Sequence, residues 1–281
     1  MPVILNGKLC SDEEATVSVA DRGFCYGDGL FETLRVRNGA PFRAKSHYAR
    51  LQAGAEFLGI KLPFTESQLE DQLDELVAEC DLRDAMARIA LSRGVGKRGY
   101  SPSGADSPTF VVSLSEAPEI IPGHPIPWRL HTSSIRLNQE DPILGHKTSN
   151  RLHNVLAKAE AEQLGYDDAL FLNLAENLVE ATCANLFWID GNTVCTPPAS
   201  AGALPGITRD IVLRLCDRHD RQIAEEDGTL QNLASADGAF LSVSSMGIIE
   251  IGRVDQMIVP IHELTRELHA DWWELVDEET R

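Results

Sequence analysis

"ILGHKTSNRLHNVLAKAEAEQLGYDDALFLN" (residues 143–173) places a lysine directly before a helix and an apolar strand directly after it. Apolar residues recur at helical spacing over 151–165, whereas "DDALFLN" (167–173) is a short apolar run typical of a strand. Lys147 is followed by Thr-Ser-Asn, residue types that favour turns and helix starts. The stretch therefore predicts a turn that presents a lysine amine at the start of a helix. Taken alone, a lysine in such a turn is most simply a solvent-exposed charge.

The sequence before this turn predicts a compact mixture of strands and helices. Asn-Gly dipeptides favour tight hairpin turns, and apolar spacing separates helices from strands. The expected elements are hairpins at Asn6-Gly7 and Asn38-Gly39, helices over 47–60 and 66–80, and strands at 86–93 and 109–115. Residues 118–127, "PEIIPGHPIP", hold four prolines and are typical of a linker between domains.

The sequence after the linker alternates strands and helices again. The expected strands are 128–137, 167–173, 178–197 with an Asp190-Gly191 turn inside it, and 238–251; the expected helices are 151–165, 206–219 and 261–279. These elements predict an α+β protein with two domains, residues 1–117 and 128–281, joined by the proline-rich linker at 118–127.

Composition excludes several kinds of partner and site. The net charge of −18 argues against nucleic acid and anionic membranes, because both require a basic surface. The first ten residues lack the basic and apolar regions of a signal peptide, and no apolar run approaches the roughly 18 residues of a membrane-spanning helix. Six scattered cysteines are typical of reduced thiols in a cytoplasmic protein. No spacing of His, Cys and carboxylates predicts a metal site.

Six short motifs occur in a fixed order along the chain. They are "DRGFCYGDGLFETLRV" (21–36), "HYARL" (47–51), "GHKTSNRL" (145–152), "LVEATCANLFW" (178–188), "GITRD" (206–210) and "SVSSM" (242–246). Together they resemble the class IV aminotransferase family, the fold-type IV enzymes that use pyridoxal 5'-phosphate. That family includes branched-chain aminotransferases, D-amino-acid aminotransferases and 4-amino-4-deoxychorismate lyases. The resemblance covers almost the whole chain and implies a two-domain fold and a homodimer.

The resemblance gives two residues a role in the chemistry. Lys147 matches the lysine that bonds to the cofactor aldehyde as a Schiff base and, once released, moves protons as general base and acid. Glu180 matches the glutamate that keeps the pyridine nitrogen protonated, which the cofactor needs as an electron sink. Glu180 lies among apolar or small residues, where an unpaired carboxylate would be costly to bury. An outward-facing glutamate on a strand is the plainer alternative.

The phosphate group needs cations and backbone N–H donors. In the resemblance Arg50 supplies the guanidinium, and Ser245 supplies a hydroxyl from a turn. "GITRD" opens a predicted helix, whose N-terminus favours an anion. Gly206 would allow close approach, while Ile207 and Thr208 would donate their amides, with the Thr208 hydroxyl added. Without the other motifs, the same stretch would predict only an ordinary helix start.

An anionic substrate must find a local cation on a chain of this net charge. Phe31 matches an aromatic position that faces substrate. Arg98 and Tyr100 lie in "SRGVGKRGYSP", where "RGYS" looks like the lyases, whereas the D-amino-acid enzymes carry Arg-x-His. Gly94, Gly96 and Gly99 lead us to expect a mobile loop that closes over substrate. A solvated loop charge is the simpler role for Arg98.

The motifs favour a lyase that converts 4-amino-4-deoxychorismate to 4-aminobenzoate and pyruvate. The alternative is an aminotransferase of D-amino acids or branched-chain L-amino acids with 2-oxoglutarate. Asn150-Arg151 follows the lysine where branched-chain enzymes usually have Asn-Tyr, which supports the lyase. A third possibility is a non-catalytic protein of this fold, marked by loss of Lys147 or Glu180; both residues are present.

Overall fold

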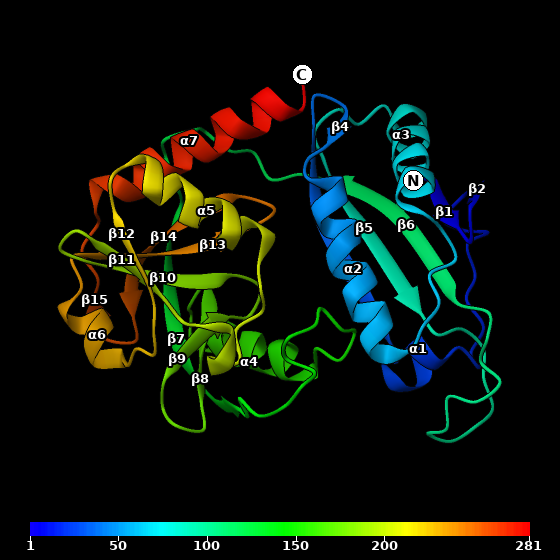
Figure 1. The fold of residues 1–281 in the computed structure, drawn as a ribbon, viewed down its shortest axis with the longest axis horizontal. Coiled ribbons are helices and arrows are strands. Elements are labelled where there is room, and N and C mark those ends of the chain that lie inside the picture. Colours follow the sequence, from blue (N-terminus) through cyan, green and yellow to red (C-terminus); the bar gives the residue numbers. More distant parts are fainter. The chain divides into compact units, whose positions relative to one another are not determined.

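A computed structural model describes all 281 residues, and the chain forms two compact units (Figure 1). The first unit comprises Met1–Pro118, His146–Asn150 and Val276–Arg281, and the second comprises Glu119–Gly145 and Arg151–Leu275. The first unit therefore regains two short segments after the chain has left it. One of these segments is the turn that carries Lys147.

The first unit is built on an antiparallel sheet of six strands in the order β2-β1-β6-β5-β3-β4. Its elements are β1 (Val3–Leu5), β2 (Lys8–Cys10), α1 (Arg22–Tyr26), β3 (Gly29–Arg37), β4 (Ala40–Pro41), α2 (Ala44–Leu58), α3 (Glu66–Cys80), β5 (Ala85–Ser92) and β6 (Thr109–Glu116). β3 pairs with β5 from Gly29 opposite Ser92 to Val36 opposite Ala85. Alternate residues of β3 thus face opposite sides of the sheet.

One face of this sheet forms the core of the first unit. Leu30, Leu34 and Val36 of β3 are buried there and cluster with Leu51 of α2 and Leu73 of α3. Two local signals set the helix ends. A capping box between Thr65 and Gln68 opens α3, and left-handed Gly59 ends α2.

The second unit contains a nine-stranded mixed sheet in the order β12-β11-β10-β13-β14-β7-β8-β9, with β15 paired to β14. Its elements are β7 (Pro127–Leu137), α4 (Leu152–Gln163), β8 (Asp168–Asn173), β9 (Leu178–Ala181), β10 (Asn185–Asp190), β11 (Thr193–Thr196), a short 3-10 helix (Ala199–Ala201), α5 (Ile207–Arg218), β12 (Gln222–Glu225), α6 (Leu230–Ser235), β13 (Gly238–Val243), β14 (Gly247–Val254), β15 (Met257–Ile258) and α7 (Glu263–Glu279). Because β9 also pairs with β10, the strands from β10 to β9 close into a ring. Leu130, Leu186 and Leu241 lie in its core.

The predicted α+β class and the long elements are confirmed. The five predicted helices are α2, α3, α4, α5 and α7, and hairpins form at Asn6-Gly7, Asn38-Gly39 and Asp190-Gly191. The short elements α1, α6, β12 and β15 were not predicted, because elements of a few residues carry no readable apolar period. None of the helices combines the length and the apolar character that crossing a bilayer requires.

Candidate cofactor and substrate site

The Lys147 turn is attached to the beginning of β3. Phe31 N donates to the Lys147 carbonyl at 3.0 Å, and Ser149 N donates to the Gly29 carbonyl at 2.8 Å. This pairing brings the half-buried lysine side chain beside Phe31, and Nζ lies 4.7 Å from the ring centroid. The structure therefore brings together two of the predicted residues of the first unit, Phe31 on β3 and Lys147 in the turn paired with that strand.

A second cation, which the sequence analysis missed, lies over the same ring. Arg88 of β5 stands opposite Thr33, two residues from Phe31, so both side chains emerge on the same face of the sheet. Its Cζ lies 4.2 Å from the Phe31 centroid. Partial burial lowers the pKa of Arg88 below its usual value, although the side chain reaches solvent and makes no ion pair. The sequence offered one signal for Arg88: it is an isolated arginine between Ala87 and Ile89, which are both buried.

The opposite face of β3 carries a buried cluster of charged and polar side chains. Arg50 Nε and Nη2 donate to the two carboxylate oxygens of Glu32 at 2.8 Å and 2.7 Å. His47 Nδ1 lies 2.7 Å from Glu32 Oε2. Glu32 is fully buried, and Arg50 and His47 both extend from α2. The predicted phosphate-binding arginine is thus held in one orientation by a carboxylate that the sequence analysis did not select.

The pKa values in this cluster follow from burial and hydrogen bonding. Burial raises the pKa of Glu32, but hydrogen bonds and charge from Arg50 and His47 outweigh it and lower that pKa to about 2. Burial lowers the pKa of His47, with Glu32 opposing the shift. At neutral pH Glu32 is therefore a carboxylate that balances the Arg50 guanidinium, and His47 is a neutral ring that donates to it.

In the structure, the loop that carries Arg98 and Tyr100 is not closed over Phe31 and Lys147. Both side chains are exposed, Tyr100 by 89%, and neither contacts Phe31 or Lys147. Gly94 has φ +89°, and a Cβ there would lie 1.9 Å from the Ser107 carbonyl oxygen. This glycine is required by a close backbone approach, so it is not evidence for the mobility that the glycine content suggested.

Glu180 lies in the second unit on β9, next to its partner Asn185 on β10. Its Oε2 accepts from Asn185 Nδ2 at 3.0 Å and from the Leu204 backbone N–H at 3.0 Å. Asn185 Nδ2 also donates to the Leu204 carbonyl at 2.8 Å. Asn185, which the sequence analysis missed, therefore fixes the carboxylate and joins it to the segment before α5. Its position inside "ATCANLFW" gave no local sign of this role.

The predicted anion site of the second unit is formed by the start of α5. Gly206 is its N-cap, Ile207 is its first residue, and Thr208 is buried in the first turn. Thr208 Oγ1 lies 3.4 Å from Ser244 Oγ in the turn between β13 and β14, the turn that also holds half-buried Ser245. Helix N–H groups and hydroxyls are hence adjacent here, as phosphate binding requires.

Gly206 shows that this site is built for close approach. Its φ of −73° is available to any residue, so backbone freedom does not demand glycine. A Cβ at this position would lie 1.9 Å from Asn185 Oδ1. The glycine therefore makes room for the asparagine that orients Glu180.

A helix N-terminus for phosphate, a fixed carboxylate for a ring nitrogen and a lysine amine for an aldehyde match the groups of pyridoxal phosphate.

Comparison with known proteins agrees with this chemistry. The family model described as Amino-transferase class IV matches residues 29–254. The chain is 34% identical over 272 residues to a Methanocaldococcus jannaschii protein named "Putative branched-chain-amino-acid aminotransferase", covering 95% of this chain and 94% of that one. It is 32% identical over 264 residues to the aminodeoxychorismate lyase of Vibrio harveyi, covering 91% and 95%.

The fold agrees as well. A T.th. branched-chain amino acid aminotransferase, solved with pyridoxamine 5'-phosphate, matches with a TM-score of 0.93 at 25% identity, covering 100% of this chain and 95% of that one. The fold-type IV architecture and the dependence on pyridoxal 5'-phosphate that the motifs implied are therefore confirmed. The chain belongs to the class IV aminotransferase family of pyridoxal-phosphate-dependent enzymes.

Proposed function

We propose that this enzyme is a lyase that converts 4-amino-4-deoxychorismate to 4-aminobenzoate and pyruvate, with Lys147 as its acid–base group. The observation that carries the proposal is the face of β3 on which the Lys147 amine and the Arg88 guanidinium both lie over the Phe31 ring. Arg88 makes no ion pair that would compete with an anionic substrate. The similarity to the Vibrio harveyi lyase supports the specific reaction.

In this proposal Lys147 and Glu180 supply two groups that the chemistry of pyridoxal phosphate requires. When bound, pyridoxal phosphate supplies an aldehyde that bonds to amines and a ring that withdraws electrons. Lys147 of the first unit provides the enzyme's amine. Glu180 of the second unit holds the proton on the ring nitrogen, and its orientation by Asn185 supports that role.

The phosphate would be bound by groups whose orientation is fixed before the cofactor arrives. Arg50 supplies the guanidinium, pre-oriented by its two hydrogen bonds to Glu32. The α5 N-terminus supplies the remaining donors, from Gly206, Ile207, Thr208 and the nearby Ser245. Since these groups lie on rigid elements, little conformational freedom is lost when they bind an anion.

The reaction requires one proton to be removed and one group to leave. Lys147 removes the proton from the ring carbon that bears the amino group. The bond between the ring and the enolpyruvyl oxygen breaks, and the leaving group takes up a proton to become pyruvate. Formation of the aromatic ring of 4-aminobenzoate drives the step. Arg88 and Arg98 are available for the substrate carboxylates, with Tyr100 beside Arg98.

The second candidate is an aminotransferase acting on D-amino acids or branched-chain L-amino acids. The 34% identity to the Methanocaldococcus jannaschii protein favours it, and so does the structural similarity to the branched-chain enzyme solved with pyridoxamine 5'-phosphate. Lys147 would then move the α-proton of an amino acid, and water would release a keto acid. The same residues serve both reactions, so substrate recognition decides between them.

Parallel assays of the purified enzyme separate the two candidates. Pyruvate release from 4-amino-4-deoxychorismate is measured beside transamination of D- and L-amino acids with 2-oxoglutarate. We expect pyruvate release to be the faster reaction. Transamination that clearly exceeds pyruvate release would overturn the lyase assignment in favour of the aminotransferase.

The role of Lys147 has an independent chemical test. Borohydride reduction of the holoenzyme should attach the cofactor covalently to Lys147, which peptide mass spectrometry would locate. Lys147→Ala should lose this label and essentially all turnover. Lys61→Ala, which changes an exposed lysine of the same unit, is the matched control and should keep both. Label on any lysine other than Lys147 would refute the assignment.

We also propose a homodimer that acts in the cytoplasm on a small anionic substrate. Leu152, Val155 and Leu156 form an exposed apolar stripe at helical spacing on α4, which a second copy would cover. The six free cysteines support a reducing compartment. Light scattering should give twice the chain mass, and Val155→Glu should shift it towards the monomer. A monomeric native enzyme would contradict the dimer.

A further inference from the structure

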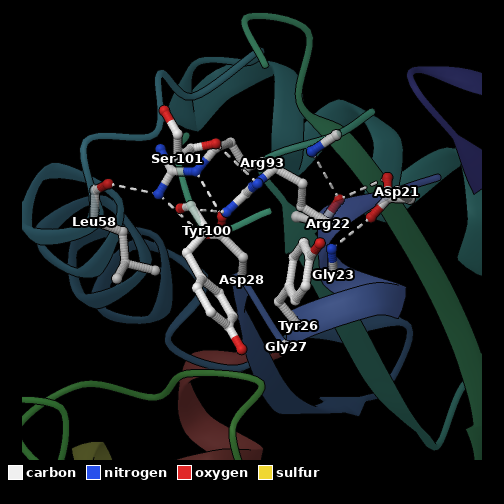
Figure 2. A network of polar contacts seen from close by, with 12 residues as sticks. Asp21, Arg22, Gly23, Tyr26, Gly27, Asp28, Leu58, Arg93, Tyr100 and Ser101 are labelled. Carbon is white, nitrogen blue, oxygen red and sulfur yellow. Dashed lines mark hydrogen bonds and ion pairs between the residues drawn. The ribbon is translucent and has the colours of Figure 1, made fainter. Parts of the chain in front are cut away.

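A buried arginine outside the predicted site forms hydrogen bonds with the backbone of the loop that carries Arg98 and Tyr100. Arg22, the first residue of α1, is only 4% exposed. Its Nη1 donates to the carbonyls of Gly99 at 2.9 Å and Ser101 at 3.0 Å, and its Nη2 donates to the Tyr100 carbonyl at 3.1 Å (Figure 2). One guanidinium thus binds three consecutive peptide carbonyls. A lysine ammonium lacks the planar fork of donors that this arrangement uses.

The charges around Arg22 explain why it needs those carbonyls. Its Nε donates to Asp28 Oδ2 at 2.7 Å, but Arg93 binds the same carboxylate through two bonds of 2.8 Å and 2.9 Å (Figure 2). Burial raises the pKa of Asp28, and the two arginines more than reverse this, so the pKa lies below its usual value. One carboxylate therefore faces two guanidiniums, and carbonyl dipoles must stabilise the remaining positive charge.

Arg93 extends this network to α2. Its Nη2 donates to the Leu58 carbonyl at 2.8 Å (Figure 2). Its Nη1 donates to the Gly59 carbonyl at 3.2 Å, so that Arg93 satisfies the C-terminal end of that helix. Asp28 directly precedes β3, the strand of Phe31 and Glu32. The loop at 97–102 is hence tied through Arg22, Asp28 and Arg93 to the two elements that carry the candidate site of the first unit.

Two further contacts hold the same loop. The Gly99 backbone N–H donates to the Tyr26 hydroxyl at 2.9 Å, and the Tyr26 and Tyr100 rings lie 5.7 Å apart. Gly96 leaves space for the arginine, because a Cβ there would lie 2.8 Å from Arg22 Cδ. Gly96 thus accommodates the Arg22 side chain that holds the loop.

We propose that Arg22 is a positioning residue that fixes the backbone of residues 97–102, so that Arg98 and Tyr100 are presented to the anionic substrate in one arrangement. The inference rests on the proposed function for the identity of the substrate. The anchoring itself is independent of substrate. Arg22 acts on substrate recognition through the loop, and its loss leaves the cofactor-binding groups of α2 and α5 in place.

Arg22→Lys in the holoenzyme tests the anchoring first. The lysine keeps a positive charge for Asp28 but loses the fork to the three carbonyls. Amide hydrogen exchange in residues 97–102, measured without substrate, should become about tenfold or more faster. Arg35→Lys is the matched control, because Arg35 is also buried in this unit, pairs with Asp84 and donates to the Pro118 carbonyl. The control should leave exchange in the loop unchanged.

Steady-state kinetics with 4-amino-4-deoxychorismate test the consequence. Arg22→Lys should raise KM about tenfold and leave kcat and the visible absorption of the bound cofactor nearly unchanged. Gly96→Ala displaces Arg22 without removing its charge and should also raise KM. If Arg22→Lys fails to fold, Gly96→Ala tests the positioning role in its place.

Unchanged loop exchange in the folded variants would overturn the anchoring. Faster exchange with a native KM, or a fall in kcat alone, would overturn the positioning role. An enzyme that transaminates without releasing pyruvate would refute the proposed lyase, and the KM for its amino acid substrate would then decide the role of Arg22. The exchange result stands in either case, so failure of the function and failure of the inference are distinguishable.

Discussion

Glu32 of the first unit and Glu180 of the second are both strand glutamates, and their carboxylates have different hydrogen-bond partners. Glu32 is neutralised by the two-pronged Arg50 guanidinium. Glu180 Oε2 accepts hydrogen bonds from the Asn185 side-chain amide and the Leu204 backbone N–H, which are neutral donors. Glu32 therefore orients a cation, whereas neutral groups orient Glu180 Oε2.

The largest effect is expected from removing the charge of Glu32. Glu32→Gln leaves Arg50 without its counter-ion on a largely buried face, which should cost about 3–5 kcal/mol of folding free energy. Urea unfolding of the apoenzyme measures this loss. Glu56→Gln, on the exposed side of the same helix as Arg50, should change stability by less than about 0.5 kcal/mol. Equal stability of the two variants would show that the Glu32–Arg50 pair contributes no net stability.

The same pair predicts a dependence on pH. The pKa of Glu32 falls from 4.5 to about 2 in the folded protein, so its contribution is fully present above about pH 4.5 and is lost as the pH falls towards 2. The stability difference between the native enzyme and Glu32→Gln should therefore shrink over this interval. Unfolding curves at several pH values measure it, and a constant difference would contradict the assigned pKa.

The next largest effect is expected at Glu180. Glu180→Gln keeps the shape but removes the charge that would hold a proton on the cofactor ring, so kcat should fall about 100- to 1000-fold while the cofactor stays bound. Glu250→Gln is a matched control, because Glu250 is a buried strand glutamate of the same unit that pairs with Arg266. Near-native turnover in Glu180→Gln would remove Glu180 from the mechanism.

The smallest effect should come from Asn185. Asn185→Ala removes one neutral donor and leaves the Leu204 N–H on Glu180 Oε2, so a loss of about 1–2 kcal/mol, roughly tenfold in kcat, is expected. Asn173→Ala, which removes a buried asparagine from β8, controls for general loss of packing. If both variants lose turnover equally, Asn185 has no specific role in orienting Glu180.

Local chemistry made the long elements predictable from the sequence. The capping box at Thr65 and Gln68, the left-handed glycine after α2 and the Asn-Gly turns each involve residues a few positions apart. The roles of Lys147 and Glu180 came instead from their resemblance to family motifs, and these roles remain predictions. Neither residue carries a local pattern that identifies its chemistry.

The charge partners could not be predicted in this way. Arg93 and Asp28 are 65 residues apart, and Arg22 binds carbonyls 77 to 79 residues later in the chain. A sequence shows that a guanidinium and a carboxylate exist, but only the folded chain shows which of them meet. For the same reason, the glycines around Arg98 suggested mobility but gave no sign of the hydrogen bonds from buried Arg22 to the loop carbonyls.

The contact between Gly206 and Asn185 has a consequence for evolution and for engineered libraries. Because the Cβ of any other residue at 206 would collide with the asparagine amide, the two positions are epistatic. A larger residue at 206 should be tolerated only on a background in which Asn185 has already become smaller, and that background gives up a donor to Glu180. Single-site libraries will therefore score position 206 as invariant, whereas a combinatorial library of positions 185 and 206 could reach active sequences that carry a larger residue at 206.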